Sequence, residues 1–364
     1  MTTINEIFRM FGPEYLLRFS NHMPAHHKKI IRAITDCRTE NYGTNVYECE
    51  KCGKYNILFR SCGNRHCPGC QGFKTHQWVR KQLEKQLPGH HFMITFTVPE
   101  QIRRFIRSHQ RKTYAALFDA ASYAMKKLAK DEKYIGGDLP GFFGILHTWG
   151  RQLQYHPHIH FIVAGGAISK ATGSWHASRI DFYLPVRALS KIFKAKFKEQ
   201  MDQADLLASI PNEAWAVKWN VNCQAVGSSE HSIKYLSCYV FKVAMSNSRI
   251  VKLEDRKVFF KYQKQKSQRW RTTQLDAMEF IRRFLQHVLP AGFMKIRYYG
   301  FMHPSCSVAL NEISARIQMA YGFEIDPSKP EIEPPAPFLC PDCGGNLLFR
   351  TSVVPCKKFP SSSG

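Results

Sequence analysis

The sequence has no apolar run that approaches the ~18 residues of a membrane-spanning helix, and its acidic residues are few. Residues 1–20 contain no basic segment followed by an apolar one, so they do not resemble a secretory signal. No internal repeat or low-complexity segment is apparent before the C-terminal tail. These absences exclude membrane-spanning and repeat proteins and argue against secretion. We therefore expect a cytoplasmic protein with no membrane partner.

The scarcity of acidic residues leaves a large positive charge. Among 364 residues, 52 are Lys or Arg and 28 are Asp or Glu, which gives a formal net charge of +24. Such an excess is typical of proteins that bind a polyanion, most often nucleic acid. The length predicts two or three domains at about 100–200 residues each, and a hydrophobic content of 44% is sufficient for a sizeable core.

Twelve cysteines in a chain without a secretory signal favour reduced thiols and metal sites over disulfides. Two C-x-x-C pairs, Cys49/Cys52 and Cys67/Cys70, are separated by fourteen residues. Each pair suits a tight turn in which both thiolates reach one ion, and two such turns complete a tetrahedral zinc site. The spacing therefore predicts one structural Zn²⁺ bound by these four cysteines, in a basic module that binds nucleic acid.

Other candidate zinc ligands are less well defined by their spacing. Cys37, Cys62 and His66 either form part of a second site or, in the case of the cysteines, are small buried apolar groups. Near the C-terminus, after a Pro-rich stretch at 327–337, Cys340 and Cys343 form half of a zinc ribbon. The residues that would complete this ribbon are His303, Cys306 or Cys356.

Two histidines lie in the run QYHPHIHFIVAGG, which covers residues 154–166. In a β-strand, His158 and His160 project from one face, because side chains alternate with period two. The residues between and after them are apolar and suit the opposite, buried face. Two neutral imidazoles on one face are half of a divalent-metal site, and the alternative is a pair of ordinary strand histidines.

Two tyrosines lie on a helix predicted over residues 228–247. Tyr235 and Tyr239 stand at positions i and i+4, so their hydroxyls lie on one face. A tyrosine that attacks a DNA phosphodiester conserves the bond energy in a phosphotyrosine and frees a 3′-hydroxyl. A metal ion on the histidines would stabilise the charge on the phosphate, and Lys242 would add positive charge nearby. The alternative is that one tyrosine is catalytic and the other packs against the sheet.

Residues 251–272 alternate basic and aromatic side chains and predict a hairpin. Backbone contact and base stacking on DNA are expected from this segment, in particular from Lys261, Lys264, Trp270 and Arg271. Periodicity and breaker residues predict the other elements. Helices are expected in residues 1–36, 73–87, 100–130, 187–208 and 275–289, and strands in residues 91–98, 142–148, 154–164 and 215–222.

Several of these motifs together resemble a known family. The HUH motif of rolling-circle endonucleases, two histidines around a hydrophobic residue, is similar to HPHIH in this chain. The tyrosine motif of IS91-like rolling-circle transposases resembles KYLSCYVFKVAMSNSRI, which contains Tyr235 and Tyr239. The zinc-binding domain and first catalytic strand of that family resemble CRTENYGTNVYECEKCG, SCGNRHCPGCQ and HHFMITFTVP. The resemblance covers about residues 20–300.

The resemblance implies an α+β fold. Its HUH endonuclease domain is a central antiparallel sheet with flanking helices and the histidines on a middle strand, preceded by a small cysteine-rich zinc-binding domain. We expect the zinc-binding, DNA-binding domain over residues 1–88, the catalytic domain over 89–300, and a C-terminal region with half a zinc ribbon over 301–364. The implied activity is DNA transposition, by metal-dependent cleavage and joining of single-stranded DNA through a 5′-phosphotyrosine intermediate.

The resemblance also implies cofactors and partners. The catalytic ion is Mg²⁺ or Mn²⁺, without the acidic triad of other transposases, and the partners are single-stranded transposon ends and target DNA in a bacterial nucleoid. The oligomeric state is left open. HUH sites usually have a third metal ligand, and four side chains remain candidates for it: Gln152, Gln154, His147 and His156.

Three other functions compete with this interpretation. A plasmid replication initiator or relaxase would use the same chemistry, but the N-terminal cysteine module favours a transposase. A binuclear metallohydrolase would need Asp and His where the chain has Ile162 and Val163. A non-enzymatic zinc-finger protein would bind DNA without nicking it.

Overall fold

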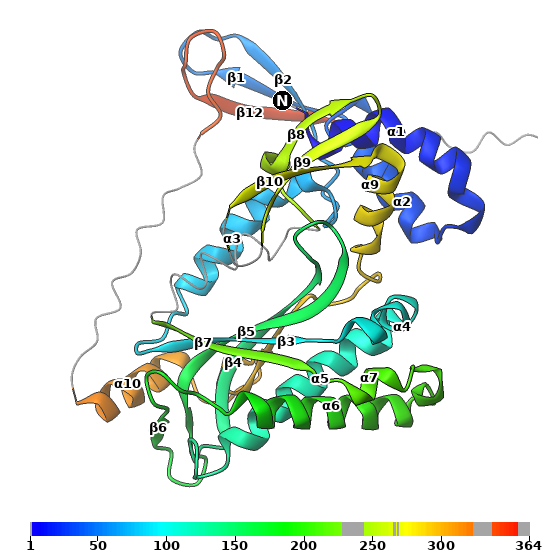
Figure 1. Cartoon of the computed structure of the whole chain (residues 1–364). Coiled ribbons are helices and arrows are strands. Elements are labelled where there is room, and N and C mark those ends of the chain that lie inside the picture. Colours follow the sequence, from blue (N-terminus) through cyan, green and yellow to red (C-terminus); the bar gives the residue numbers. More distant parts are fainter. Residues whose placement is uncertain (1, 228–243, 265–266, 268, 323–336, 356–364) are drawn as a thin grey trace, which may run out of the picture. The chain divides into compact units, whose positions relative to one another are not determined.

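Two units organise the chain, and neither is a continuous stretch of sequence. The computed structural model describes residues 2–227, 244–264, 267, 269–322 and 337–355. One unit, here called the cysteine unit, comprises residues 1–74, 241–288 and 331–364, and the other, the histidine unit, comprises residues 75–240 and 289–330 (Figure 1). The C-terminal segment joins the cysteine unit because its strand pairs with the first strand of the chain. Residues 241–288 join it through contacts such as that of Phe284 with Phe8, whose ring centroids lie 5.1 Å apart.

A central antiparallel sheet forms the middle of the histidine unit. Its strands are β3 (His91–Thr97), β4 (Leu139–Trp149), β5 (Tyr155–Ile168), β7 (Asn220–Gly227) and β11 (Ile296–Tyr299), and the short β6 (Trp175–Ala177) pairs with β5. The order across the sheet is β11-β4-β5-β3-β7, so β5 lies in the middle. The predicted α+β class with a central antiparallel sheet is confirmed, and the β4–β5 hairpin lies where the sequence predicted it.

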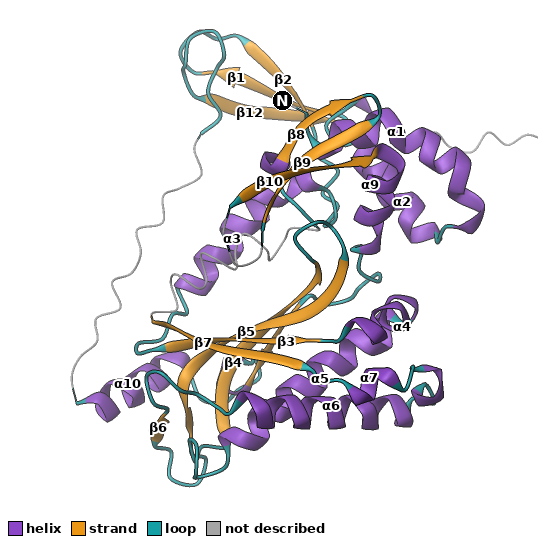
Figure 2. Cartoon of the chain, in the orientation of Figure 1, coloured by secondary structure: helices purple, strands orange, loops and turns teal. Residues whose placement is uncertain are grey.

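Helices cover one face of this sheet (Figure 2). They are α4 (Arg103–Ser108), α5 (Gln110–Ala129), α6 (Val186–Gln203) and α7 (Glu213–Ala216), while α10 (Leu310–Tyr321) packs beside β6. The strand residues beneath them are aromatic: the ring of Phe96 lies 5.0 Å from that of Phe193 on α6, and Phe161 lies 6.3 Å from Phe118 on α5. Because strand residues alternate, the histidines of β5 lie on the opposite face.

The strand predicted over residues 215–222 is wrong in its first half. Trp215 lies on α7, and the strand begins only at Asn220. The aromatic residues that suggested a strand pack in the core instead: the rings of Trp215 and Trp219 stack 5.8 Å apart, and the Trp219 indole donates a 3.0 Å hydrogen bond to the Ala214 carbonyl. Tertiary packing therefore overrides the β-propensity of this segment.

The cysteine unit contains two three-stranded antiparallel sheets and several helices. Its helices are α1 (Ile4–Phe19), α2 (Ala25–Thr35) and α9 (Ala277–Gln286), and α3 (Gln71–Leu83) begins in this unit. The first sheet has the order β12-β1-β2, formed by β12 (Leu347–Val353), β1 (Thr44–Cys49) and β2 (Tyr55–Phe59). The second has the order β10-β9-β8, formed by β8 (Ile250–Glu254), β9 (Lys257–Gln263) and β10 (Trp270–Asp276). The predicted hairpin over 251–272 is therefore part of a larger meander.

Short 3-10 turns connect these elements. They lie at Ser20–His22, Glu40–Tyr42, Pro68–Cys70, Glu100–Ile102, Leu207–Ser209, Asn247–Arg249 and Gly300–Met302. Within the part of the chain that the structure describes, no helix combines the length and apolar character needed to cross a bilayer. Most of the helix predicted over 228–247 lies outside the described residues.

Candidate functional site

Three histidines converge on the face of the central sheet opposite α5 and α6. His158 and His160 project from β5, and His147 of β4 stands directly opposite His158 in the strand register. Their ligand nitrogens all lie within 4.8 Å of one another. The ring of His147 lies 4.7 Å from that of His160, and the rings of His158 and His160 lie 4.9 Å apart. The structure therefore brings the predicted pair together with one of the four candidates for a third ligand.

Hydrogen bonds orient two of these rings. The Nδ1 of His158 lies 2.7 Å from the backbone oxygen of His156, and a carbonyl can only accept, so this nitrogen carries the proton. The Nε2 of His158 then has the free lone pair that a metal requires. The Nδ1 of His160 lies 2.9 Å from the hydroxyl of Thr95, its direct partner on β3. Both rings are thus oriented by hydrogen bonds to groups of the sheet, on β5 and β3.

Burial keeps the three imidazoles neutral. It lowers the pKa of His158 to about 4, and it lowers the pKa values of His147 and His160 well below their usual range. The three rings add to this effect, because charging one disfavours charging its neighbours. A neutral imidazole is the form that binds a metal, so the cluster is in its ligand state near pH 7. The residues present fit a divalent ion bound by three nitrogens.

The other candidates for a third ligand are arranged differently. The side-chain oxygen of Gln154 accepts a 2.9 Å hydrogen bond from the backbone nitrogen of Gln152, within the turn between β4 and β5. His156 lies beside His158, with ring centroids 5.2 Å apart, but does not join the group of three. His147 is therefore the side chain that the hairpin register selects.

An arginine stands close to this cluster. Arg103, at the start of α4, is near enough for its charge to contribute to the lowered pKa values of His156 and His158, after the larger effect of burial. Its Nε is buried and has no hydrogen-bond partner among the described residues, and burial lowers its own pKa. A guanidinium with an unused buried donor is suited to an anionic oxygen such as that of a phosphate. The sequence predicted a helix over residues 100–130 but did not single out Arg103 as a functional residue.

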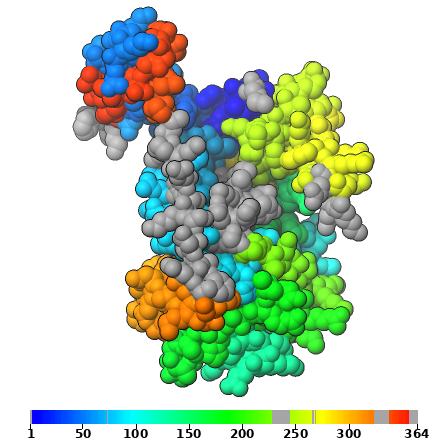
Figure 3. All heavy atoms as spheres, turned by 90° about the vertical axis from the view of Figure 1, so that its left-hand side faces the viewer, coloured from blue at the N-terminus to red at the C-terminus, as the bar shows by residue number. Residues whose placement is uncertain are grey.

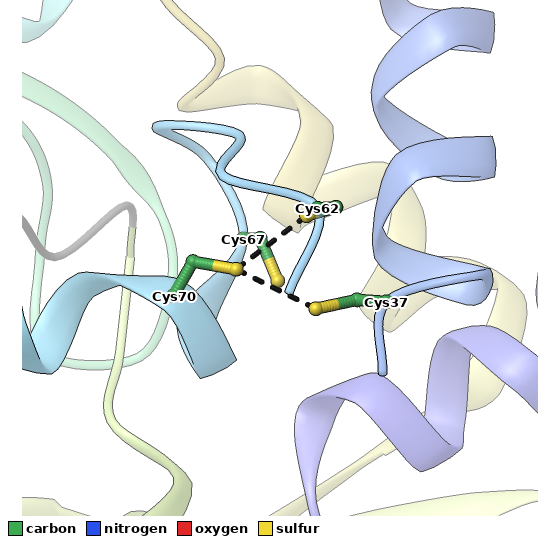
Figure 4. A group of neighbouring side chains, drawn as sticks. All are labelled: Cys37, Cys62, Cys67 and Cys70. Atoms are coloured by element: carbon green, nitrogen blue, oxygen red, sulfur yellow. Dashed lines mark hydrogen bonds between the residues drawn. The ribbon is translucent and has the colours of Figure 1, made fainter. Parts of the chain in front are cut away.

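The first cysteine cluster is built from three separate segments at the start of the chain. Cys37 follows α2, and Cys62 lies in the loop after β2. Cys67 precedes the 3-10 turn before α3, and Cys70 is the last residue of that turn. The four side chains point toward one another (Figure 4). The Cys70 sulfur lies 3.5 Å from the sulfurs of both Cys37 and Cys62. Sulfurs around a tetrahedral zinc stand about 3.8 Å apart, given Zn–S bonds of about 2.3 Å. Hydrogen bonding among the four thiols lowers the pKa values of Cys37 and Cys70 and raises those of Cys62 and Cys67. These residues fit a structural zinc ion.

The second cluster joins the two ends of the chain. Cys49 and Cys52 meet Cys340 and Cys343, with sulfur–sulfur distances of 3.4 Å for Cys49–Cys343 and 3.8 Å for Cys52–Cys340. The predicted single site is thus corrected: its two C-x-x-C pairs belong to different clusters, because β12 pairs with β1 and carries the C-terminal cysteines to Cys49.

Other residues proposed as zinc ligands do not enter these clusters. His66, His303 and Cys306 belong to neither group, and Cys356 lies outside the described residues. One signal could have found the second group. The pairs that meet both read C-x-x-C-G, at residues 49–53 and 340–344, whereas Cys70 is followed by Gln71.

The residues predicted to bind DNA lie on the β8–β9–β10 sheet. Lys261 on β9 stands opposite Thr272, and Trp270 opposite Gln263, so Lys261 and Trp270 share one face. Arg271 lies on the other face, and Lys264 follows β9 in the connection to β10. The side chain of Trp270 is 60% exposed, which is unusual for tryptophan and leaves its ring available for stacking. The predicted catalytic residues Tyr235, Tyr239 and Lys242 lie outside the described residues.

Comparison with known proteins gives the class of the protein. Residues 7–98 match the family described as transposase zinc-binding domain, and residues 141–309 match the family described as putative transposase. Both are domains of enzymes that move DNA segments. The chain is 35% identical over 319 residues to the putative transposase y4qJ of Sinorhizobium fredii (strain NBRC 101917 / NGR234), which covers 82% of this chain and 80% of that protein.

A second relative is the transposase for insertion sequence element IS801 of Pseudomonas savastanoi pv. phaseolicola. It is 25% identical over 351 residues, which cover 89% of this chain and 83% of that protein. No solved structure matches the chain. The chain belongs to the IS91-like family of insertion-sequence transposases, with an N-terminal zinc-binding domain. The family resemblance inferred from the sequence is confirmed.

Proposed function

We propose that this transposase cleaves and joins single-stranded DNA through a 5′-phosphotyrosine intermediate, in a rolling-circle reaction that uses a divalent ion held by His147, His158 and His160. The observation that carries the proposal is the convergence of these three neutral imidazoles on the middle strand of an antiparallel sheet and its neighbour. Such a reaction acts on chromosomal and plasmid DNA, which corresponds to a location at the bacterial nucleoid.

The ion, when bound, would polarise the scissile phosphate and offset the charge that builds on its oxygens. Three nitrogen donors favour Mn²⁺ over Mg²⁺, because Mg²⁺ is the harder ion and prefers oxygen ligands. The sheet holds the donors in place: the Thr95 hydroxyl orients His160, and the His156 carbonyl orients His158. The protein therefore contributes a ligand set in which two of the three rings are already oriented by the sheet.

The nucleophile in this proposal is Tyr235 or Tyr239. Its hydroxyl oxygen bonds to phosphorus, the bond from phosphorus to the 3′ oxygen breaks, and the proton lost by the tyrosine ends on the released 3′-hydroxyl. Attack by another 3′-hydroxyl on the phosphotyrosine reverses the step and joins the strands. Two tyrosines allow one to hold the first DNA end while the other attacks a second strand, and Lys242 adds positive charge.

DNA contacts outside the reaction centre complete the proposal. Arg103 would donate its unused Nε–H to an oxygen of the scissile or adjacent phosphate, beside the histidines. The exposed ring of Trp270 would stack on a base, and Lys261 on the same face would contact the backbone. The net charge of +24 supports binding that depends on phosphates.

The test uses labelled single-stranded DNA that carries the ends of the element, incubated with the full chain and Mn²⁺. We expect a covalent adduct on Tyr235 or Tyr239, which mass spectrometry of the digested adduct identifies. His158→Ala and His160→Ala should abolish the adduct while DNA binding is retained. His176→Ala, on the same sheet but outside the cluster, should leave the adduct intact.

The tyrosine variants separate chemistry from packing, because Tyr→Phe removes only the hydroxyl. If both tyrosines are nucleophiles, each single change leaves an adduct on the other, and only the double change removes it. Tyr123→Phe, an exposed tyrosine on α5, serves as the matched control. An adduct that survives the double change Tyr235→Phe/Tyr239→Phe would falsify the proposal.

A further inference from the structure

The two turns of the second cysteine cluster have the same backbone conformation, although they lie near opposite ends of the chain. Residues 49–54 read CEKCGK and residues 340–345 read CPDCGG. In each turn the glycine nitrogen donates a 2.9 Å hydrogen bond to the carbonyl of the first cysteine, Gly53 to Cys49 and Gly344 to Cys340. The two glycines have φ values of 69° and 68°, in the left-handed region that favours glycine. Each turn is therefore shaped to direct two sulfurs to one point.

The sulfurs of the two turns meet at the spacing that zinc requires. Their distances of 3.4 and 3.8 Å are far longer than a disulfide bond of about 2.05 Å and close to the edge of a zinc–thiolate tetrahedron, about 3.8 Å. The backbone also makes room for them. A Cβ on Gly345 would lie 3.0 Å from the Cys49 sulfur and 3.4 Å from the Cys343 sulfur. Position 345 therefore has no room for a larger side chain beside these two sulfurs.

The sheet beside this cluster has almost no hydrophobic core. Among residues 44–59 and 337–355, the buried side chains are those of Cys49 and Cys340. Large apolar side chains of the same strands are exposed, among them Tyr55 at 68%, Ile57 at 65% and Phe349 at 56%. A three-stranded sheet needs a buried apolar face or another covalent or metal link to be stable in water. The only buried side chains in these two described ranges are therefore two thiols, one from each turn.

Ion pairs do not supply the missing stability. Lys54 lies 2.9 Å from Asp342 and Arg350 lies 2.8 Å from Glu48, and both pairs join the N-terminal and C-terminal segments. The side chains of Lys54, Asp342 and Arg350 are all more than half exposed, so water and salt screen these contacts. The pair of Arg350 and Glu48 joins β12 to β1 and stabilises this strand pairing only weakly.

We infer that Cys49, Cys52, Cys340 and Cys343 bind a second structural Zn²⁺, and that this ion fastens β12 to the β1–β2 hairpin. Figure 3 shows side chains of the N-terminal and C-terminal segments gathered in one body, as the pairing of β1 with β12 requires. The ion replaces the thiol protons, which are released to water, and no oxidant takes part. This inference goes beyond the proposed function, because it concerns neither the histidines nor the tyrosines.

The first experiment counts thiolate-bound metal in the purified full chain. Substitution with Co²⁺ reports thiolate sites through sulfur-to-cobalt charge-transfer absorption, which imidazole ligands do not give. We expect two such ions per chain, and one in Cys340→Ser/Cys343→Ser and in Cys49→Ser/Cys52→Ser. Cys306→Ser, a cysteine outside both clusters, should keep two. A wild-type chain with one thiolate-bound ion, or a double variant that keeps two, overturns the inference.

The second experiment asks whether the ion holds the two ends together. A recognition site for a specific protease is inserted into residues 323–336, the folded full chain is cut there, and the products are separated by size. The C-terminal fragment should remain with the rest of the chain and leave when a chelator is added. It should also leave in Cys49→Ser/Cys52→Ser, although its own cysteines are intact. A fragment that dissociates from zinc-loaded wild-type protein, or that stays bound in this variant, contradicts the inference. Neither experiment measures DNA cleavage. A failure of the proposed function can therefore be distinguished from a failure of the inference about the second zinc ion.

Discussion

The histidine unit and the cysteine unit form their candidate metal sites in opposite ways. In the histidine unit, the candidate ligands come from two adjacent strands whose other face is packed with aromatic side chains. The packing of that face stabilises the sheet, so the sheet does not depend on a metal ion. In the cysteine unit, the ligands of the second cluster come from segments distant in the sequence, and two of them, Cys49 and Cys340, are the buried side chains of a sheet without an apolar core. The comparison indicates that the fold positions the histidine ligands, whereas the ion proposed for the second cysteine cluster would itself hold its sheet together.

The largest expected effect is on the cysteine unit when metal is removed. Apparent zinc-binding free energies of about 10–16 kcal/mol in zinc-finger peptides show how much folding such a site can support. A strong chelator should therefore abolish hydrogen-exchange protection in β1, β2 and β12, while β4 and β5 stay protected. Hydrogen exchange with mass spectrometry on the full chain measures both regions at once. If the chelator changes hydrogen-exchange protection equally in the two regions, the two units do not differ in their dependence on metal.

The histidine unit should instead respond to pH through burial. Burial lowers the pKa of His91 to about 4, from a usual value near 6.5, so the folded protein resists its protonation. The unfolded chain then binds more protons between these pH values, and stability is lost as the pH falls from 6.5 towards 4. Through this difference in pKa, His91 alone changes the free energy of unfolding by up to about 3 kcal/mol. His91→Gln should flatten the pH dependence of unfolding by urea, and an unchanged slope would refute this role.

A smaller effect is expected at Arg103, and it would show whether the histidine site has a phosphate-binding partner. Arg103→Gln should lower kcat for DNA cleavage by roughly 10-fold to 100-fold, the loss of about one strong donor to a charged oxygen. Arg103→Lys should recover part of it. Arg104→Gln, the exposed neighbour, is the matched control. If the arginine only supports the fold, the variant will lower the melting temperature and leave kcat of the folded enzyme unchanged.

The smallest effect is expected on the β8–β9–β10 sheet. Trp270→Ala should weaken binding of single-stranded DNA by roughly 1–3 kcal/mol, the usual contribution of one stacked base. Binding by the wild type should also fall steeply with salt, as release of counterions from phosphates requires. Fluorescence anisotropy at several salt concentrations measures both. Tyr262→Ala, on the opposite face of the sheet, provides the comparison, and equal losses in the two variants would argue against stacking by Trp270.

The features that the sequence predicted well are local ones. Alternation over β5 places both histidines on one face, and this depends on only a few consecutive residues. The third ligand was not singled out, because it depends on the register of the hairpin. That register is set by a turn in which Leu153 has a φ of 62°, a conformation that its residue type does not predict.

The grouping of the cysteines was missed for a different reason. Spacing alone joined the two nearest C-x-x-C pairs, whereas strand pairing between β1 and β12 joins pairs that are distant in the sequence. Similarly, Trp215 has high β-propensity but stacks on Trp219 at the end of a helical turn. In both cases a long-range contact decides the outcome, and no pattern within a short window of sequence contains it.

The cluster that joins both ends of the chain also has a consequence for the time at which the protein can finish folding. Cys49 and Cys343 are separated by 294 positions, so the first pair of ligands leaves the ribosome long before the second. At about 5–20 residues per second, synthesis of the intervening chain takes roughly 15–60 s. During that interval Cys49 and Cys52 have no partners for a closed site. If the second ion forms as inferred, the β1–β2 hairpin becomes stable only after residues 340–353 have been made, so chains that terminate before them would carry an unfinished module.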